Sequence, residues 1–138
     1  MFSNPIASYQ KVGREAEILG ADPHRLIVLL FDGAEAALTK AQGCLSAQDV
    51  PGRSDALIKA IDIIASGLSS SLNLEQGGDL ALNLKALYDY MVSRLIHANI
   101  HQDANAIAEV QKLLGELASA WREMGETSRM QLGQGATP

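Results

Sequence analysis

The sequence predicts an all-α protein: an antiparallel up-down four-helix bundle with a short N-terminal helix and a disordered C-terminal tail. Apolar residues recur at steps of three and four along four long stretches, which is the spacing of an amphipathic helix. Short segments with proline, glycine or aspartate separate the stretches, and none of the stretches alternates apolar and polar residues as a strand would. We expect an N-terminal segment at residues 1–21, the bundle at 22–124 and a flexible tail at 125–138.

Two helices are predicted on either side of Asp22, a short one before it and a long one that it begins. A short helix is expected near residues 5–11, where Asn4 can act as its cap. The first long helix should begin at Asp22 and Pro23, because aspartate caps a helix and proline is tolerated in a first turn. It should run to about Gln48. Its apolar face consists of Leu26, Ile27, Leu30, Phe31, Ala34, Ala37, Leu38, Ala41 and Leu45.

A second helix is predicted from about Arg53 to Ser71, after a break at residues 49–52 that contains proline and glycine. Its inward face consists of Leu57, Ala60, Ile61, Ile64, Ala65 and Leu68. A shallow strip of smaller residues is expected on its back, beyond the inward face. That strip consists of Ala56, Ile63 and Gly67.

The third helix should begin at Gly77, Gly78 and Asp79, because glycines permit a sharp turn and a carboxylate is favourable at a helix N-terminus. It should end near Gln102. Its inward row, beside Tyr88, consists of Leu80, Leu84, Leu87, Met91, Leu95 and Ala98. A second apolar row consists of Leu82, Ala86 and Tyr90. A bundle core uses only one such row. The second is therefore either covered by the protein itself or part of a groove that receives another helix.

A fourth helix should follow Asp103, which can cap it, and should end near Met124. Its apolar face consists of Ile107, Val110, Leu114, Leu117, Ala118 and Trp121. The residues after Met124 are mainly glycine, serine, threonine, glutamine and proline with little to bury. This composition predicts the flexible tail.

Composition excludes several classes of protein. The chain has 138 residues, 47% of them apolar, and a net charge of −5 with dispersed lysines and arginines. A nucleic-acid binder would instead carry a basic patch. The longest apolar run, Leu26 to Phe31, is far too short to cross a bilayer, and we expect no membrane insertion. The N-terminus lacks a signal pattern, and Cys44 is the sole cysteine, so a cytoplasmic protein is expected.

The sequence offers no pattern typical of an enzyme. A di-iron carboxylate bundle needs Glu-x-x-His, yet the residues three before His24, His97 and His101 are Ala21, Arg94 and Ala98. No phosphate-binding glycine loop and no serine nucleophile elbow are present. His97 and His101 are four residues apart but lie near a helix C-terminus, which favours a charged imidazole over a metal ligand. We therefore expect no catalytic residues, no metal and no cofactor.

A series of short motifs in a fixed order resembles the FliS family of flagellar secretion chaperones. The resemblance covers roughly Tyr9 to Trp121. Its motifs are Tyr9-Gln10, Ala21-Asp22-Pro23, Leu26-Ile27, Leu30 to Ala34, Leu72 to Glu75, Gly77-Gly78, Asn83-Leu84, Leu87 to Met91, Arg94-Leu95, Ala98-Asn99, Asp103 and Trp121. Two departures are Asp22 where the family usually has serine, and Phe31 where it usually has tyrosine. The first caps equally well, whereas the second removes a hydroxyl.

The resemblance implies a cytoplasmic, non-enzymatic chaperone that binds the C-terminal segment of flagellin. Such a chaperone would prevent premature polymerisation and keep the subunit competent for type III export. It also makes the groove the favoured interpretation of the second apolar row. The expected lining is Ala56, Ile63, Gly67, Leu82, Asn83, Ala86 and Tyr90.

A further hypothesis concerns the N-terminal segment, which could imitate the client helix and plug the groove when flagellin is absent. The plug would consist of Phe2, Ile6, Tyr9 and Gln10. Two alternatives stay open: a module for another helical export client, and a bundle whose outer apolar rows form a homodimer. Contact with the flagellar export gate also stays open.

Overall fold

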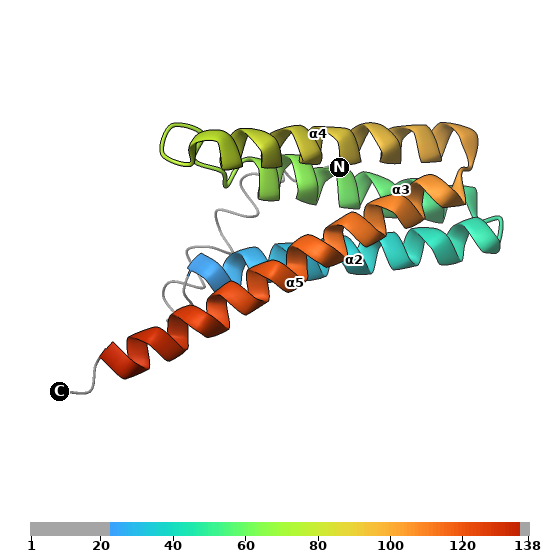
Figure 1. Ribbon diagram of the computed structural model, residues 1–138. Helices are drawn as coiled ribbons and strands as arrows, with labels where there is room; N and C mark the ends of the chain where they lie inside the picture. The colour runs from blue at the N-terminus through green and yellow to red at the C-terminus, as the bar shows by residue number, and fades with distance from the viewer. Residues whose placement is uncertain (1–22, 136–138) are drawn as a thin grey trace.

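The described part of the chain folds as an all-α bundle, as the sequence predicts (Figure 1). The computed structural model describes the backbone of residues 23–135 and the side chains of residues 23–125. Its helices are α2 (Pro23–Ser46), α3 (Val50–Asp62), the π-helical segment η1 (Ile63–Ser69), α4 (Gly78–His101) and α5 (Ala104–Gly135). No strand occurs within residues 23–135. The predicted short helix and plug near the N-terminus lie outside the described residues.

Aspartate caps begin two of these helices. The Asp103 carboxylate accepts hydrogen bonds from the backbone N–H groups of Asn105 and Ala106, at 3.0 and 3.2 Å. Asp49 likewise accepts from the N–H of Gly52 at 3.0 Å. The predicted break between the first two long helices is present but lies earlier than residues 49–52. It occupies residues 47–49, because α3 already begins at Val50 and carries its proline in the first turn.

The turn before α4 requires both of its glycines. Gly78 has a φ of +55°, in the left-handed region that side-chain-bearing residues avoid. A Cβ atom on Gly77 would lie 2.5 Å from the Cβ atom of Ala81 and 2.6 Å from the carbonyl oxygen of Asn73. The α4 helix ends at His101, and the next residue, Gln102, caps it with a left-handed backbone (φ 53°) and an N–H that donates to the carbonyl of Ala98. The chain then turns directly into α5.

One hydrophobic core joins all the helices. Its largest side chains with less than 2% exposure are Leu38, Leu57, Ile64, Leu68, Met91, Leu95, Ile107, Val110 and Leu114. Burying each such side chain contributes about 1.5–3 kcal/mol. A polar contact closes one end, where the buried Arg53 of α3 donates to the side-chain and backbone oxygens of Asn99, both at 3.2 Å. The C-terminal end of α4 is thereby tied to the start of α3.

The small-residue strip predicted on the back of the second helix is buried. Ala56 and Ile63 are 4% and 5% exposed, and Gly67 is buried as well. The Ile63 Cδ1 atom lies 3.4 Å from the position that a Cβ atom on Gly33 would occupy, so Ile63 packs against α2 at this point. The helix is covered on more than one side by its own protein, and the expected outer strip belongs to the core.

The last helix is longer than predicted. It was expected to end near Met124, but its backbone is helical to Gly135. Side chains after Gly125, and the last three residues of the predicted tail, lie outside the described part. Figure 1 shows that α5 leaves α4 at the turn between them and crosses toward α2, so the two helices diverge along their length. This divergence positions the candidate site.

Candidate functional site

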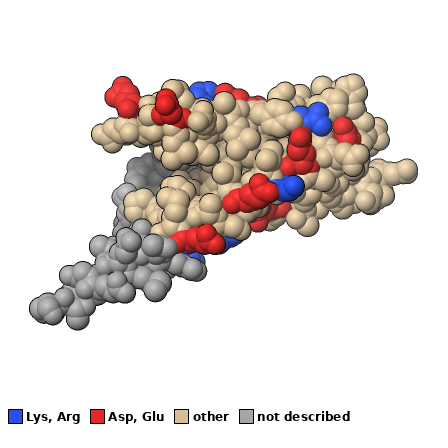
Figure 2. All heavy atoms as spheres, viewed as in Figure 1, with Lys and Arg blue, Asp and Glu red and all other residues tan. Residues whose placement is uncertain are grey.

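An apolar groove opens where α4 and α5 diverge. Its volume is about 730 Å³, and Figure 2 shows the molecule hollowed between α4 and α5 at this end. The groove is bounded by the start of α2, the turn before α4, the first half of α4 and the described end of α5. Apolar side chains dominate its lining. They include Leu26, Ile27, Phe31, Leu72, Leu80, Ala81, Leu84, Tyr88, Leu117, Ala120, Trp121 and Met124.

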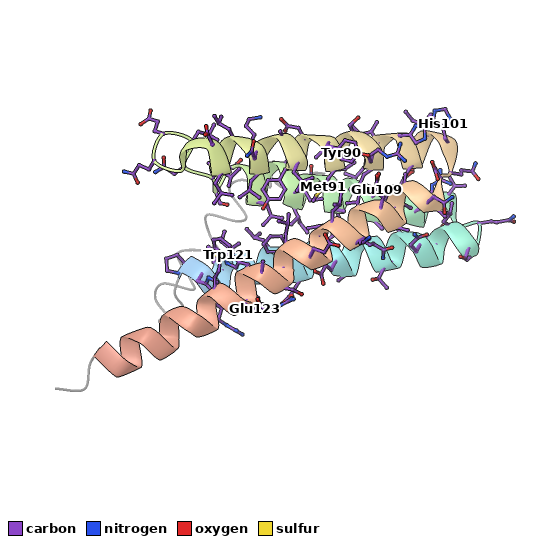
Figure 3. All side chains as sticks on the ribbon, in the orientation of Figure 1. Tyr90, Met91, His101, Glu109, Trp121 and Glu123 are labelled. Carbon is purple, nitrogen blue, oxygen red and sulfur yellow. The ribbon has the colours of Figure 1, made fainter. Side chains whose placement is uncertain are left out.

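The wall formed by α2 and α5 is held together by an aromatic pair. The rings of His24 and Trp121 stack with centroids 5.0 Å apart and planes inclined by 7°. The Trp121 indole Nε1 donates to the backbone carbonyl of His24 at 3.2 Å. Gly125 permits this approach, because a Cβ atom there would clash with Nε2 of His24. Figure 3 shows Trp121 on the side of α5 that faces α2.

Residues 31–33 belong to the series of short motifs described from the sequence, and each of the three has a different role at this wall. Phe31 is 2% exposed and lines the groove. Asp32 pairs with Arg122 on the outer side of the α2–α5 contact. Gly33 lies against Ile63, as described above. The motif therefore positions α2 against two neighbours while one of its members forms part of the groove.

The α4 wall combines a buried tyrosine with an exposed leucine. Tyr88 is 5% exposed, and burial raises the pKa of its hydroxyl. Leu80 is 69% exposed, although the sequence predicted it in the inward row. The prediction fails because α5 has diverged from α4 at this point, so nothing among the described residues covers the first turn of α4. Met124 across the groove is 57% exposed. These two side chains leave the groove with apolar edges.

The opposite end of the α4–α5 contact is closed by a polar cluster. Tyr90 Oη donates to Glu109 Oε2 at 2.9 Å, and Arg94 Nε donates to Glu109 Oε1 at 2.8 Å. The hydrogen bonds from Tyr90 and Arg94 lower the pKa of the Glu109 carboxyl, and the bond to Glu109 raises the pKa of Tyr90. Figure 3 shows Tyr90 and Glu109 facing each other across the two helices.

The predicted client-binding residues fall into two groups in the structure. Those on the third predicted helix lie exposed on α4, where Tyr90 is 44% and Leu82 is 54% exposed. Asn83 and Ala86 are exposed too. Those on the second predicted helix, Ala56, Ile63 and Gly67, are buried. The structure does not bring the two groups together into one groove. Client contact at the buried positions stays a prediction and would require α3 and η1 to move.

Several groove residues were not predicted as site residues, including His24, Ala120 and Met124. Periodicity had assigned Leu84, Leu117 and Trp121 to the core face, and they do pack partly against the core. One sequence signal for these residues is the length of the apolar face on the fourth helix, which continues beyond the residues needed to cover α4. This signal points to a groove only once it is known that α5 crosses toward α2.

Histidines near the end of α4 form a local polar contact. The His97 and His101 rings have centroids 4.5 Å apart, and His97 Nε2 lies 3.3 Å from Asp103 Oδ2. Among residues 23–125, no three histidine, cysteine, aspartate or glutamate side chains gather in a way that could hold a metal ion. No helix in the described part is long and apolar enough to cross a membrane.

Comparison with known proteins identifies the family. The family model described as flagellar protein FliS matches residues 5–128, a range that includes every described residue lining the groove. The chain belongs to the FliS family. It is 45% identical to the flagellar secretion chaperone FliS of Salmonella typhimurium, over 91% of this chain and 93% of the relative.

Two further relatives agree. The flagellar secretion chaperone FliSB of Pseudomonas aeruginosa is 43% identical, over 82% of this chain and 89% of the relative. The Escherichia coli FliS protein, also named a flagellar secretion chaperone, is 40% identical over 84% of this chain and 85% of its own length. These family members are named as chaperones and not as enzymes. The family therefore supports a role in flagellar secretion that depends on binding.

Proposed function

We propose that the protein is a cytoplasmic export chaperone that binds the C-terminal segment of flagellin in the groove between α2, α4 and α5. The bound segment is kept from polymerising and stays competent for flagellar type III export. Family membership supports the class of function, and the groove supports a mode of binding. The protein acts without catalysis, since holding a segment requires only a complementary surface.

The observation that carries this proposal is an apolar groove that the described residues leave open at the end of the bundle. Monomeric proteins rarely expose a large contiguous apolar surface unless it binds something. Grooves lined by apolar residues are a common means of holding amphipathic helices or extended peptides. Groove residues come from three helices, so a client that fills the groove would contact α2, α4 and α5 at once.

The exposed strip on α4 extends this surface. Leu82, Asn83, Ala86 and Tyr90 are exposed on the helix that forms one wall of the groove. We propose that a long client segment continues from the groove along this strip. The amide of Asn83 can bond backbone groups of a client that is not fully helical.

Two other partners would use the same surface. A different export client with an amphipathic segment would fit the groove equally well, and a second copy of the chain could cover the exposed residues of α4. Contact with the export gate would come after client binding. Flagellin is preferred because the relatives are named for flagellar secretion.

Co-purification tests this function. The full chain is mixed with monomeric flagellin, and separately with flagellin that lacks its C-terminal segment, and each mixture is resolved by size-exclusion chromatography with light scattering. The proposal expects a complex with the intact subunit only, together with slower filament growth when the chaperone is added to polymerising flagellin. Equal binding of both forms, or a stable dimer that ignores flagellin, would overturn it.

A further inference from the structure

Two tyrosines on α4 have opposite surroundings, although they are close in the sequence. Tyr90 is 44% exposed, and its hydroxyl donates to Glu109 (Figure 3). Tyr88 is 5% exposed and belongs to the hydrophobic core, yet it also lines the groove. Within residues 23–125, no group forms a hydrogen bond with its hydroxyl. The tyrosine that is buried is therefore the one whose hydroxyl lacks a partner.

The oxygen of the Tyr88 hydroxyl is open to the groove. In the described part of the chain, the only fully enclosed side-chain oxygen or nitrogen without a partner is Glu35 Oε1. The Tyr88 oxygen also has no partner, so it keeps some exposure, and the cavity that its side chain lines is the groove. Burial holds the ring among core side chains and raises the pKa of the hydroxyl, which stays protonated. The groove thus contains a hydrogen-bond donor held in place by its ring.

Two other polar side chains of the groove already have partners in their own turns. Ser71 Oγ donates to the carbonyl of Leu68 at 2.7 Å. The Asn73 side chain accepts from the N–H of Gln76 at 3.0 Å and donates to the side-chain oxygen of the same residue at 3.1 Å. A phenylalanine in place of Tyr88 would fill the same space without the cost of an unpaired hydroxyl. The hydroxyl therefore suits a bound molecule that supplies its partner.

The chemistry of that partner follows from the surroundings of the hydroxyl. A purely apolar client face would displace water from Tyr88 and supply no acceptor, which opposes binding. The backbone carbonyls of a helix are mostly bonded within the helix and give little to a donor at its side. A carboxylate would lose its own water in an apolar groove, at a larger cost. An uncharged polar side chain supplies an acceptor at the lowest cost.

We propose that the client segment carries an asparagine, glutamine, serine or threonine within the apolar face that enters the groove, and that its side-chain oxygen accepts a hydrogen bond from Tyr88. This inference rests on the proposed function and specifies the chemistry of its client. Apolar burial provides most of the affinity. The hydrogen bond selects the register of the segment, because a shift by one turn would place an apolar side chain against the hydroxyl and leave it unpaired.

Calorimetric titration with the C-terminal segment of flagellin tests this inference. Tyr88→Phe removes the hydroxyl and keeps the ring, so the full chain should bind the segment about three- to tenfold more weakly, as expected for one hydrogen bond. Its melting temperature without the client should not fall, because no bond is lost there. Thr39→Val is the control. It removes a hydroxyl that donates within α2, outside the groove, and should leave client binding unchanged.

A series of client variants makes the test specific. Each asparagine, glutamine, serine and threonine of the segment is replaced in turn by alanine, and each variant is titrated into both chains. One replacement should weaken binding to the unsubstituted chain about as much as Tyr88→Phe does, and should cause no further loss in the Tyr88→Phe chain.

Three outcomes would overturn the inference and leave the proposed function standing. The Tyr88→Phe chain could bind the natural segment equally well or more tightly, as a purely apolar client face requires. Its melting temperature could fall, which would mean that the hydroxyl already has a partner in the free protein. No client replacement could show coupling to Tyr88→Phe, which would exclude a side-chain acceptor. If the unsubstituted chain binds no flagellin segment, the inference and the proposed function both fall.

Discussion

Trp121 of α5 stacks on His24 of α2, with 5.0 Å between ring centroids, and its indole N–H donates to the carbonyl of the same histidine. This pair fixes the described end of α5 to α2 and away from α4. The groove exists because α5 pairs with α4 at one end and with α2 at the other.

Replacing Trp121 should therefore loosen the groove wall. Trp121 is only partly buried, so Trp121→Ala should lower the free energy of unfolding by about 1–3 kcal/mol, less than for a fully buried tryptophan. Trp121→Phe keeps a ring for stacking and loses only the hydrogen bond, so its cost should be smaller. Urea unfolding followed by circular dichroism measures both. Equal stability of the alanine variant and the unsubstituted chain would show that the stacked pair does not hold the helices.

Two neighbouring residues of α4 separate core from surface. Leu95 is fully buried and Ile96 is 48% exposed. Leu95→Ala should destabilise the fold by about 2–5 kcal/mol, because it leaves a cavity in the core. Ile96→Ala should change stability by no more than about 0.5 kcal/mol. Thermal unfolding of the two variants checks the register of α4, and a reversed order would mean that the helix is rotated relative to this description.

The α5 cap predicts a pH dependence of stability. The N–H groups of Ala106 and Asn105, together with His97, lower the pKa of Asp103 below its ordinary value of 3.8. A carboxyl whose pKa falls on folding stabilises the protein above that ordinary value and loses this contribution as pH falls through the folded pKa. Asp103→Asn keeps a capping side chain without the charge. Its melting temperature should be lower than that of the unsubstituted chain near neutral pH.

This difference should shrink when the two melting curves are compared at successively lower pH, below about 4. A difference that stays constant through the acid range would mean that the charge on Asp103 does not contribute to the cap.

The predicted N-terminal plug gives a test by deletion. If Phe2, Ile6 and Tyr9 compete with the client for the groove, removing residues 1–10 should raise the affinity for flagellin modestly. The truncated protein should also self-associate more readily, because apolar surface is left open. Titration and light scattering measure the two effects. Weaker binding together with a lower melting temperature would show that the segment is structural or part of the client site.

Local signals predicted most of the fold. The helices of the bundle and the cap at Asp103 follow from short-range patterns, because the residues that form each pattern lie within a few positions of one another. The start of α3 was misread although Asp49 and Pro51 form the same kind of signal as Asp22 and Pro23. The turn-like glycine beside Pro51 suggested a break, yet Gly52 donates to the Asp49 cap.

The candidate site could be predicted only in part. Periodicity shows which face of a helix is apolar, but it does not show which other helix covers that face. Leu80 belongs to the same row as Leu84 and Met91, but only the neighbour's course decides which of them is covered. Ile63 was assigned to an outer strip, and it is buried because Gly33 on α2 lies against it. Both errors concern contacts between segments far apart in the sequence.

The central claim is that flagellin's C-terminal segment occupies the groove beside Leu80. Leu80 and Ile100 lie on the same helix with equal exposure, 69% each, but only Leu80 lines the groove. Calorimetric titration of the segment into Leu80→Asn and Ile100→Asn is the most direct measurement, since neither change should unfold the bundle. If the segment occupies the groove, Leu80→Asn should bind it at least about tenfold more weakly, from the loss of one buried leucine contact, and Ile100→Asn should bind it unchanged. Unchanged binding by Leu80→Asn, or an equal loss in both variants, would contradict it.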